Sequence, residues 1–137
     1  MDGIQIYFII LLLSSIGSFW IYYYVFNIYE IIYRLEPKEL YADNRSTIEL
    51  RIIPLNAIGK KVPLRYSRTK FEIKEGKELV KILTEDYKKG KLTLQADYKA
   101  GKVIVYFKAE HSLFPSSVEI NILTEKQIIK DKSKKNL

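Results

Sequence analysis

The hydrophobic positions of the chain follow two different patterns in two unequal segments. Residues 3–29 are almost wholly apolar and carry no charged side chain. Because roughly 20 apolar residues span the hydrocarbon core of a bilayer as a helix, this run predicts a transmembrane helix. We expect it to continue through residues 30–34 and to stop before Pro37, since the residue before a proline avoids the α conformation. The anchor is therefore expected over residues 1–34, with membrane lipid contacting residues 4–33.

The second half of the predicted helix is rich in aromatic side chains. They are Phe19, Trp20, Tyr22, Tyr23, Tyr24, Phe26, Tyr29 and Tyr33. Such rings settle at the headgroup level because they combine an apolar body with a polar tip, so residues 22–33 are expected to mark the membrane exit. A cleaved signal peptide is the alternative, because Ser15-Ile16-Gly17 has the small-residue spacing of a cleavage site. The apolar run continues well past that position, which favours the anchor.

Small side chains lie on one side of the predicted helix. Ser14 and Ser18 are four residues apart, and Gly17 lies beside them. This spacing lets two membrane helices approach closely. Ser14, Gly17 and Ser18 are therefore candidate helix-packing residues, for self-association or for docking to another membrane helix. A lipid-facing serine patch is the alternative.

After Pro37 the pattern changes to an alternation of apolar and polar residues with period two, which is typical of β-strands. The clearest alternations lie at residues 46–55, 91–98, 102–110 and 117–124, and shorter candidates at 35–42, 61–66, 70–74 and 79–83. Turns that contain glycine separate many of them. About seven short strands at this spacing predict an all-β, two-sheet sandwich over residues 35–124, with a small barrel as the alternative.

Several turn motifs accompany the predicted strands. Residues 40–46 read Leu-Tyr-Ala-Asp-Asn-Arg-Ser, residues 59–63 read Gly-Lys-Lys-Val-Pro, and Gly90 and Gly101 precede two later strands. This set resembles the bacterial immunoglobulin-like (Ig-like) domains of invasin and intimin type over about residues 36–123. The resemblance implies an Ig-like β-sandwich that is extracytoplasmic, structural or adhesive, and not catalytic.

The chain departs from the pattern of that family in three places. Asn44 replaces the turn glycine, Asn56 stands where an aspartate is usual, and Val62-Pro63 reverses the usual order. Asn44 is the mildest departure, since asparagine tolerates a left-handed backbone. The layout, an N-terminal helix followed by an Ig-like sandwich, is also similar to archaellum stator subunits and archaeal pilins. A pilin would have a basic residue before the glycine, where this chain has Asp2.

Composition excludes several kinds of active site. The chain has no cysteine and one histidine, His111, so a disulfide, a cysteine-ligated metal and a two-histidine site are excluded within one copy. Glu85 and Asp86 stand together at a strand end, where solvated turn charges are the ordinary interpretation. Asp43 is expected to form an Asx-type turn with Ser46, a calcium site being the alternative. We therefore expect no enzymatic activity, no cofactor and no bound metal.

Charge divides the chain at the same place as hydropathy, because all 23 Lys and Arg residues lie at or beyond Arg34. One stretch is a candidate patch for an anionic partner such as lipid headgroups, acidic glycans or an acidic protein. Its members are Lys60, Lys61, Arg65, Arg68, Lys70, Lys74, Lys77 and Lys81. The alternative is a lysine-rich surface that merely prevents strands from pairing edge to edge.

Two further expectations follow from the polar part of the sequence. No predicted strand presents paired exposed aromatic residues, so we do not expect a nucleic-acid partner. Residues 125–137 are basic and are predicted to form a disordered tail.

Two signals disagree about the side of the membrane. Basic residues follow the helix and none precedes it, which favours a cytoplasmic domain, whereas the family resemblance implies an extracytoplasmic one, which we expect.

The expected function is that of a non-enzymatic, single-pass cell-membrane protein. Its Ig-like domain, held near the membrane, would contact a protein partner, a second copy or a cell-surface layer. A pilin-like filament subunit and an accessory subunit of a membrane protein complex are the alternatives.

Overall fold

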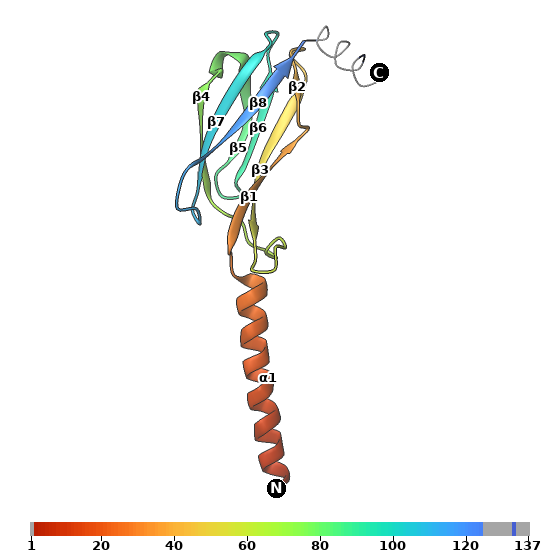
Figure 1. Cartoon of the computed structure of the whole chain (residues 1–137), viewed down its shortest axis with the longest axis vertical. Coiled ribbons are helices and arrows are strands. Elements are labelled where there is room, and N and C mark those ends of the chain that lie inside the picture. The colour runs from red at the N-terminus through yellow and green to blue at the C-terminus, as the bar shows by residue number, and fades with distance from the viewer. Residues whose placement is uncertain (1, 125–132, 134–137) are drawn as a thin grey trace.

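The computed structural model describes residues 2–124 and 133 and contains a long helix that projects from a β domain (Figure 1). The helix α1 comprises Gly3–Phe26, and none of its residues is buried. At a rise of about 1.5 Å per residue it extends about 36 Å, which exceeds the roughly 30 Å of a bilayer's hydrocarbon core. α1 is therefore long enough and apolar enough to cross a membrane.

The predicted continuation of the helix through residues 30–34 is wrong. α1 ends earlier, and β1 (Glu30–Glu36) occupies these residues. β1 pairs antiparallel with β3 (Thr47–Leu55) along its whole length. As a strand, the segment packs Ile31 and Leu35 against the core, and a continued helix would lose that packing and the pairing with β3.

Residues 22–33, which were expected to mark the membrane exit, do not form one continuous helix. They are divided between α1 and β1, because α1 ends earlier than predicted. The aromatic side chains up to Phe26 belong to α1. Tyr33 belongs to β1 and contacts Phe107, with 5.8 Å between the ring centroids. Only the helical part of the aromatic segment therefore remains available to lie at a headgroup level along α1.

The domain consists of two sheets that pack face to face. Besides β1 and β3, the elements are β2 (Leu40–Tyr41), β4 (Thr69–Glu75), the 3-10 helix η1 (Lys77–Leu79), β5 (Val80–Asp86), β6 (Lys91–Ala96), β7 (Gly101–Ala109) and β8 (Ser116–Leu123). Within the described residues they form two four-stranded sheets, in the orders β1-β3-β6-β5 and β2-β8-β7-β4. β2 runs parallel to β8, and the other paired strands are antiparallel.

This strand order is that of an immunoglobulin sandwich. Ig domains place strands A, B, E and D in one sheet and C, F and G in the other. The same division results here when β1, β3, β4, β5, β6, β7 and β8 are taken as A to G, with β2 as an extra short strand beside G. The predicted fold class, an Ig-like β-sandwich after one N-terminal apolar helix, is confirmed.

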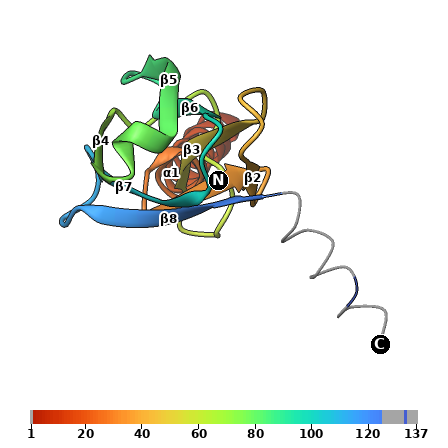
Figure 2. The ribbon, with the colours of Figure 1, turned by 90° about the horizontal axis from the view of Figure 1, so that it is seen from above.

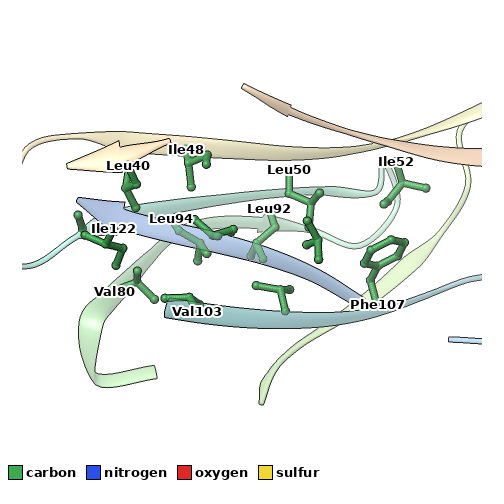
Figure 3. Close-up of a cluster of buried hydrophobic side chains, with 14 of the residues drawn as sticks. Leu40, Ile48, Leu50, Ile52, Val80, Leu92, Leu94, Val103, Phe107 and Ile122 are labelled. Carbon is green, nitrogen blue, oxygen red and sulfur yellow. The ribbon is translucent and has the colours of Figure 1, made fainter. Parts of the chain in front are cut away.

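The core lies between the two sheets. Seen from above, β7 and β8 lie on one side of the domain and β6 and β5 on the other, with α1 beneath (Figure 2). The buried side chains point inward from both sheets (Figure 3). They are Leu40, Ile48, Leu50, Ile52, Val80, Leu92, Leu94, Ala96, Val103, Val105, Phe107, Ala109, Val118, Ile120 and Ile122. Most of them are the apolar members of the predicted alternations, so the pattern had indicated the inner face of each strand.

The four long alternations correspond to β3, β6, β7 and β8, with ends that differ from the predicted ends by at most two residues. Two short candidates lie in or beside β4 and β5. The candidate at 35–42 is divided between β1 and β2. The tail predicted over 125–137 lies outside the described residues, apart from Ser133.

The strand candidate at 61–66 is wrong, because this segment is a loop with a single bridge between Leu55 and Lys61. Pro63 has no N–H to donate to a neighbouring strand. Leu64 has a φ of 55°, which lies outside the β region. The alternation of residue types was present there, but the backbone does not support a strand.

Candidate functional site

The most distinctive arrangement lies at the junction between α1 and the domain. The last carbonyl groups of a helix have no partner within it. In α1, the Val25 carbonyl accepts a hydrogen bond from Asn56 Nδ2 at 3.1 Å. The Phe26 carbonyl accepts one from Arg65 Nη1 at 3.0 Å. Both donors belong to the loop of residues 56–68, here called the junction loop, which therefore holds the helix end in addition to the covalent connection.

Asn56 has a second role, within the junction loop itself. Its side chain is buried, and Oδ1 accepts hydrogen bonds from the N–H groups of Ile58 (3.2 Å) and Lys60 (2.9 Å). The resembled family usually has aspartate at this position, and a carboxylate accepts hydrogen bonds but donates none. Only the amide can order the loop and also donate to the Val25 carbonyl. This departure from the family pattern thus has a structural reason.

Two other loops lie beside the junction loop at the helix end of the domain (Figure 1). They are the β5–β6 loop (residues 87–90) and the β7–β8 loop (residues 110–115). Thr69 directly follows the junction loop, and its N–H donates a hydrogen bond to the Tyr87 carbonyl at 2.9 Å. The Arg68 carbonyl accepts one from Glu110 N–H at 2.8 Å. We call the three together the end loops, since these bonds join them.

The eight basic residues predicted as one patch do not lie together. Lys60, Lys61, Arg65 and Arg68 belong to the junction loop, Lys70 and Lys74 to β4, Lys77 to η1 and Lys81 to β5. β4 runs from the helix end of the domain to the opposite end (Figure 1). Consecutive parts of the basic stretch are therefore spread over the length of the domain, and half of them gather at the helix end.

The structure gathers a different set of basic residues in a hollow on the outer face of the β1-β3-β6-β5 sheet. Five basic side chains and one carboxylate line this basic hollow, which has a volume of about 500 Å³. They are Arg34, Arg51, Lys61, Lys89, Lys91 and Asp86, with Tyr66 and other uncharged residues between them. Their charge is complementary to a phosphate or carboxylate group.

The pairing register explains how the hollow forms from residues that are distant in sequence. Arg34 lies opposite Arg51 across β1 and β3, and Arg51 lies opposite Lys91 across β3 and β6. Three basic residues are therefore neighbours on adjacent strands. Of the basic residues that line the hollow, the predicted patch includes only Lys61. The prediction grouped residues that are close in sequence, and closeness in sequence does not reveal the pairing register. The outward positions of the alternations were the only available signal.

Glu49 compensates part of this positive charge. It accepts from Lys91 Nζ at 2.7 Å and from Arg51 Nε in a close contact. Partial burial raises the pKa of Glu49, but hydrogen bonds from Lys91 and Arg51 outweigh it and lower the pKa below its usual value. Glu49 therefore stays charged and orients two of the basic side chains beside the hollow.

Asp43 forms the predicted Asx-type turn. Its carboxylate accepts hydrogen bonds from the N–H groups of Arg45 (2.8 Å) and Ser46 (2.6 Å) and from Ser46 Oγ (2.7 Å). The hydrogen bonds from Ser46 and then that from Arg45 lower the pKa of Asp43 to about 2. The turn also contains Asn44 with a φ of 55°, the left-handed conformation for which asparagine can replace glycine.

This turn predicts a specific response to acid. Since the folded-state pKa of Asp43 is depressed, its contribution to stability is present above the unfolded pKa near 4 and is lost as pH falls toward 2. We expect Asp43→Asn to keep the acceptor but to flatten the loss of unfolding free energy between pH 5 and pH 2. Denaturant titrations at several pH values measure this slope, with Ser46→Ala expected to be intermediate. An unchanged slope in Asp43→Asn would contradict the assignment.

The remaining predicted sites are placed as follows. Ser14 and Ser18 are exposed on α1 and Gly17 is half-buried by its own helix, so helix packing stays a prediction. His111 lies in the β7–β8 loop, with its Nδ1 3.4 Å from Ser67 Oγ. Within residues 2–124 and 133, no group of three His, Cys, Asp or Glu residues is placed to hold a metal ion.

Comparison with known proteins gives the fold. The sequence matches no protein-family model and none of the curated proteins. Two solved structures of glycosyl hydrolase family 2 members from Bacteroides cellulosilyticus are similar, with TM-scores of 0.54 and 0.52 and identities of 17% and 18%. The matches cover 71% and 69% of this chain but 14% and 15% of those chains. The adhesin InvE of Yersinia pseudotuberculosis matches at a TM-score of 0.45 and 13% identity, over 69% of this chain and 26% of its own. At these identities the likeness concerns the sandwich fold.

Proposed function

We propose that this protein is a single-pass membrane protein without enzymatic activity, whose Ig-like domain is a structural and binding module held at the extracytoplasmic membrane surface. The observation that carries the proposal is the junction. α1 is uncharged and has no buried residue, and its last two carbonyls are bound by Asn56 and Arg65 of the domain. Such an attachment serves a domain that must keep one position relative to the membrane.

The short connection supports the same proposal. Only residues 27–29 separate α1 from β1, and Tyr29 N–H already donates to the Leu55 carbonyl at 2.8 Å. A connection without flexible Gly- or Ser-rich sequence does not let a domain search far from its anchor. The domain is therefore suited to a partner that lies close to the bilayer.

A protein partner is favoured by the edge strand β5. This strand lies at the end of its sheet, so one row of its backbone groups is unpaired by a neighbouring strand. Ile82 and Leu83 are each half exposed on it, beside the register shift between Ile82 and Thr84. Exposed apolar side chains on an open edge are suited to contact with a protein, which includes a second copy of this chain.

An accessory subunit of a membrane protein complex is the second candidate function. The exposed side of α1 that bears Ser14 and Ser18 favours it, because small side chains permit close helix contacts. In that case the main contact would be made within the bilayer rather than by the sandwich.

Single-cysteine variants test the proposal, because the chain has no cysteine of its own. Lys99→Cys, in the exposed turn between β6 and β7, should react with a membrane-impermeant maleimide on intact cells. Leu83→Cys should give a cross-linked product with a partner chain, and Lys99→Cys should give less. Labelling of Lys99→Cys only after lysis would contradict the extracytoplasmic location. Cross-linking from Ser18→Cys but not from Leu83→Cys would support the accessory-subunit function instead.

A further inference from the structure

The end loops carry exposed apolar side chains that have no role in the core. Leu64 is 95% exposed, Leu113 89%, Phe114 76% and Ile58 58%. Single exposed apolar residues are common on protein surfaces, but these four lie on two loops at the same end of the domain. In the described part of the chain, the turns at the opposite end expose Tyr41 and Tyr98 but no large aliphatic side chain.

The formal charge of the loops also differs between the two ends of the domain. The end loops contain six basic residues and one acidic residue, Glu110, a formal charge of +5; the basic residues are Lys60, Lys61, Arg65, Arg68, Lys88 and Lys89. The opposite turns, residues 37–46, 76–79 and 97–100, contain four basic and four acidic residues and are formally neutral. Apolar tips among basic side chains are typical of surfaces that bind an anionic membrane interface.

The attachment of α1 gives the height of these loops relative to a bilayer. α1 is about 36 Å long and the hydrocarbon core about 30 Å thick, so the last turn of an inserted α1 lies at the headgroup level. Asn56 and Arg65 contact the carbonyls of that last turn. The junction loop therefore lies at the headgroup level too. The β7–β8 loop extends toward the same side of the domain (Figure 1), and a modest helix tilt, which is usual for such helices, would bring it to the interface.

The backbone of Leu64 supports a role for its side chain. Its φ of 55° is a left-handed conformation that is unfavourable for leucine and free for glycine. The side chain is fully outside the core, so packing within the domain does not offset the cost of this backbone conformation. A leucine at this position is explained if its side chain is buried by something outside the domain.

We propose that the end loops bind the surface of the anionic bilayer in which α1 is inserted. Leu64, Leu113 and Phe114 enter the headgroup region, and the lysines and arginines around them contact lipid phosphates. Lys61 and Lys89 also line the basic hollow, so a lipid headgroup at this surface has the hollow beside it. This inference rests on the proposed function, since it requires α1 to be in the membrane.

Fluorescence of the full chain in lipid nanodiscs tests the contact. An environment-sensitive fluorophore is attached to Leu64→Cys, to Leu113→Cys and, as the control, to Lys99→Cys at the opposite end. In nanodiscs that contain phosphatidylglycerol, emission from positions 64 and 113 should shift to the blue. It should also be quenched several-fold more by lipid-bound quenchers than emission from position 99.

A matched pair of charge variants tests the role of the lysines. In the Leu113→Cys background, Lys60, Lys61, Lys88 and Lys89 are changed to Gln, and in the control Lys74, Lys77, Lys81 and Lys99 are changed to Gln. Both variants lose the same charge. The first should lose the difference between phosphatidylglycerol and phosphatidylcholine nanodiscs, and the second should keep it.

Two outcomes separate this inference from the proposed function. If the chain is incorporated into nanodiscs but positions 64 and 113 are as accessible to a water-soluble quencher as position 99, the end loops do not bind the bilayer, and the anchor is unaffected. If the chain is not incorporated, the anchor itself is contradicted. An equal effect of the two charge variants would overturn the role given to the end-loop lysines.

Discussion

Replacing Asn56 by alanine should lower the free energy of unfolding of the domain by about 2–3 kcal/mol. The change removes the acceptor of two backbone N–H groups in the junction loop and the donor to the Val25 carbonyl. Because the side chain is only 3% exposed, water does not readily take its place. Denaturant unfolding of the full chain in detergent, followed by circular dichroism, measures the loss.

Asn56→Asp separates the two roles of this residue. The carboxylate can still accept from Ile58 and Lys60, but it cannot donate to Val25 and places an oxygen beside that carbonyl. We expect a smaller loss of stability than in Asn56→Ala together with a looser helix attachment. Spin labels on Tyr22→Cys in α1 and Lys99→Cys in the domain would report a broader distance distribution. An unchanged distribution in Asn56→Asp would show that the hydrogen bond from Asn56 to the Val25 carbonyl is not needed to orient the domain.

Gly76→Ala should be at least as destabilising, by about 3 kcal/mol or more. Gly76 has a φ of 73°, and a Cβ atom there would lie 2.4 Å from the Lys102 carbonyl oxygen and 3.0 Å from Val103. The first contact is with backbone of β7, which cannot move without disturbing its pairing. Both the left-handed conformation and the clash therefore oppose alanine. Thermal unfolding should show the loss as a clear decrease in Tm.

Gly59→Ala is the matched control for this effect. Gly59 has the same φ of 73°, but nothing lies within 4 Å of an added Cβ. Its loss should be limited to about 1–2 kcal/mol for the left-handed backbone. The difference between the two variants measures the clash with β7. Equal losses would mean that β7 relaxes freely around the new methyl group.

The sandwich could be predicted from the sequence because its long strands alternate strictly. In β3, for example, Ile48, Leu50 and Ile52 face the core and are separated by exposed or partly exposed residues, and this period is visible without any structure. The short segments were harder. Residues 30–34 follow directly on the apolar run and were expected to be helical, but their pairing with β3 decides the conformation. A partner distant in sequence leaves no local sign.

Only part of the candidate site could be predicted, because some of its residues come together through pairing with strands that are distant in sequence. The junction loop and its lysines follow one another in sequence, and four of the predicted basic residues indeed lie there. The basic hollow combines Arg34, Arg51 and Lys91 through register, and register depends on the whole sheet. The β7–β8 loop joins the helix end only because β7 runs back toward α1. Neither relationship can be obtained from spacing along the chain.

The placement of the two outer connections of the sandwich has a mechanical consequence. The chain enters the domain from α1 through Glu30, at the start of β1, and β8 ends at Leu123, at the opposite end. A pull between α1 and a partner bound after β8 therefore acts along the strands. It would slide β1 past β3 and β8 past β7, so that the ladder hydrogen bonds of each pair bear the load together instead of opening one by one. The arrangement that joins α1 firmly to the domain thus also suits the domain to transmit tension.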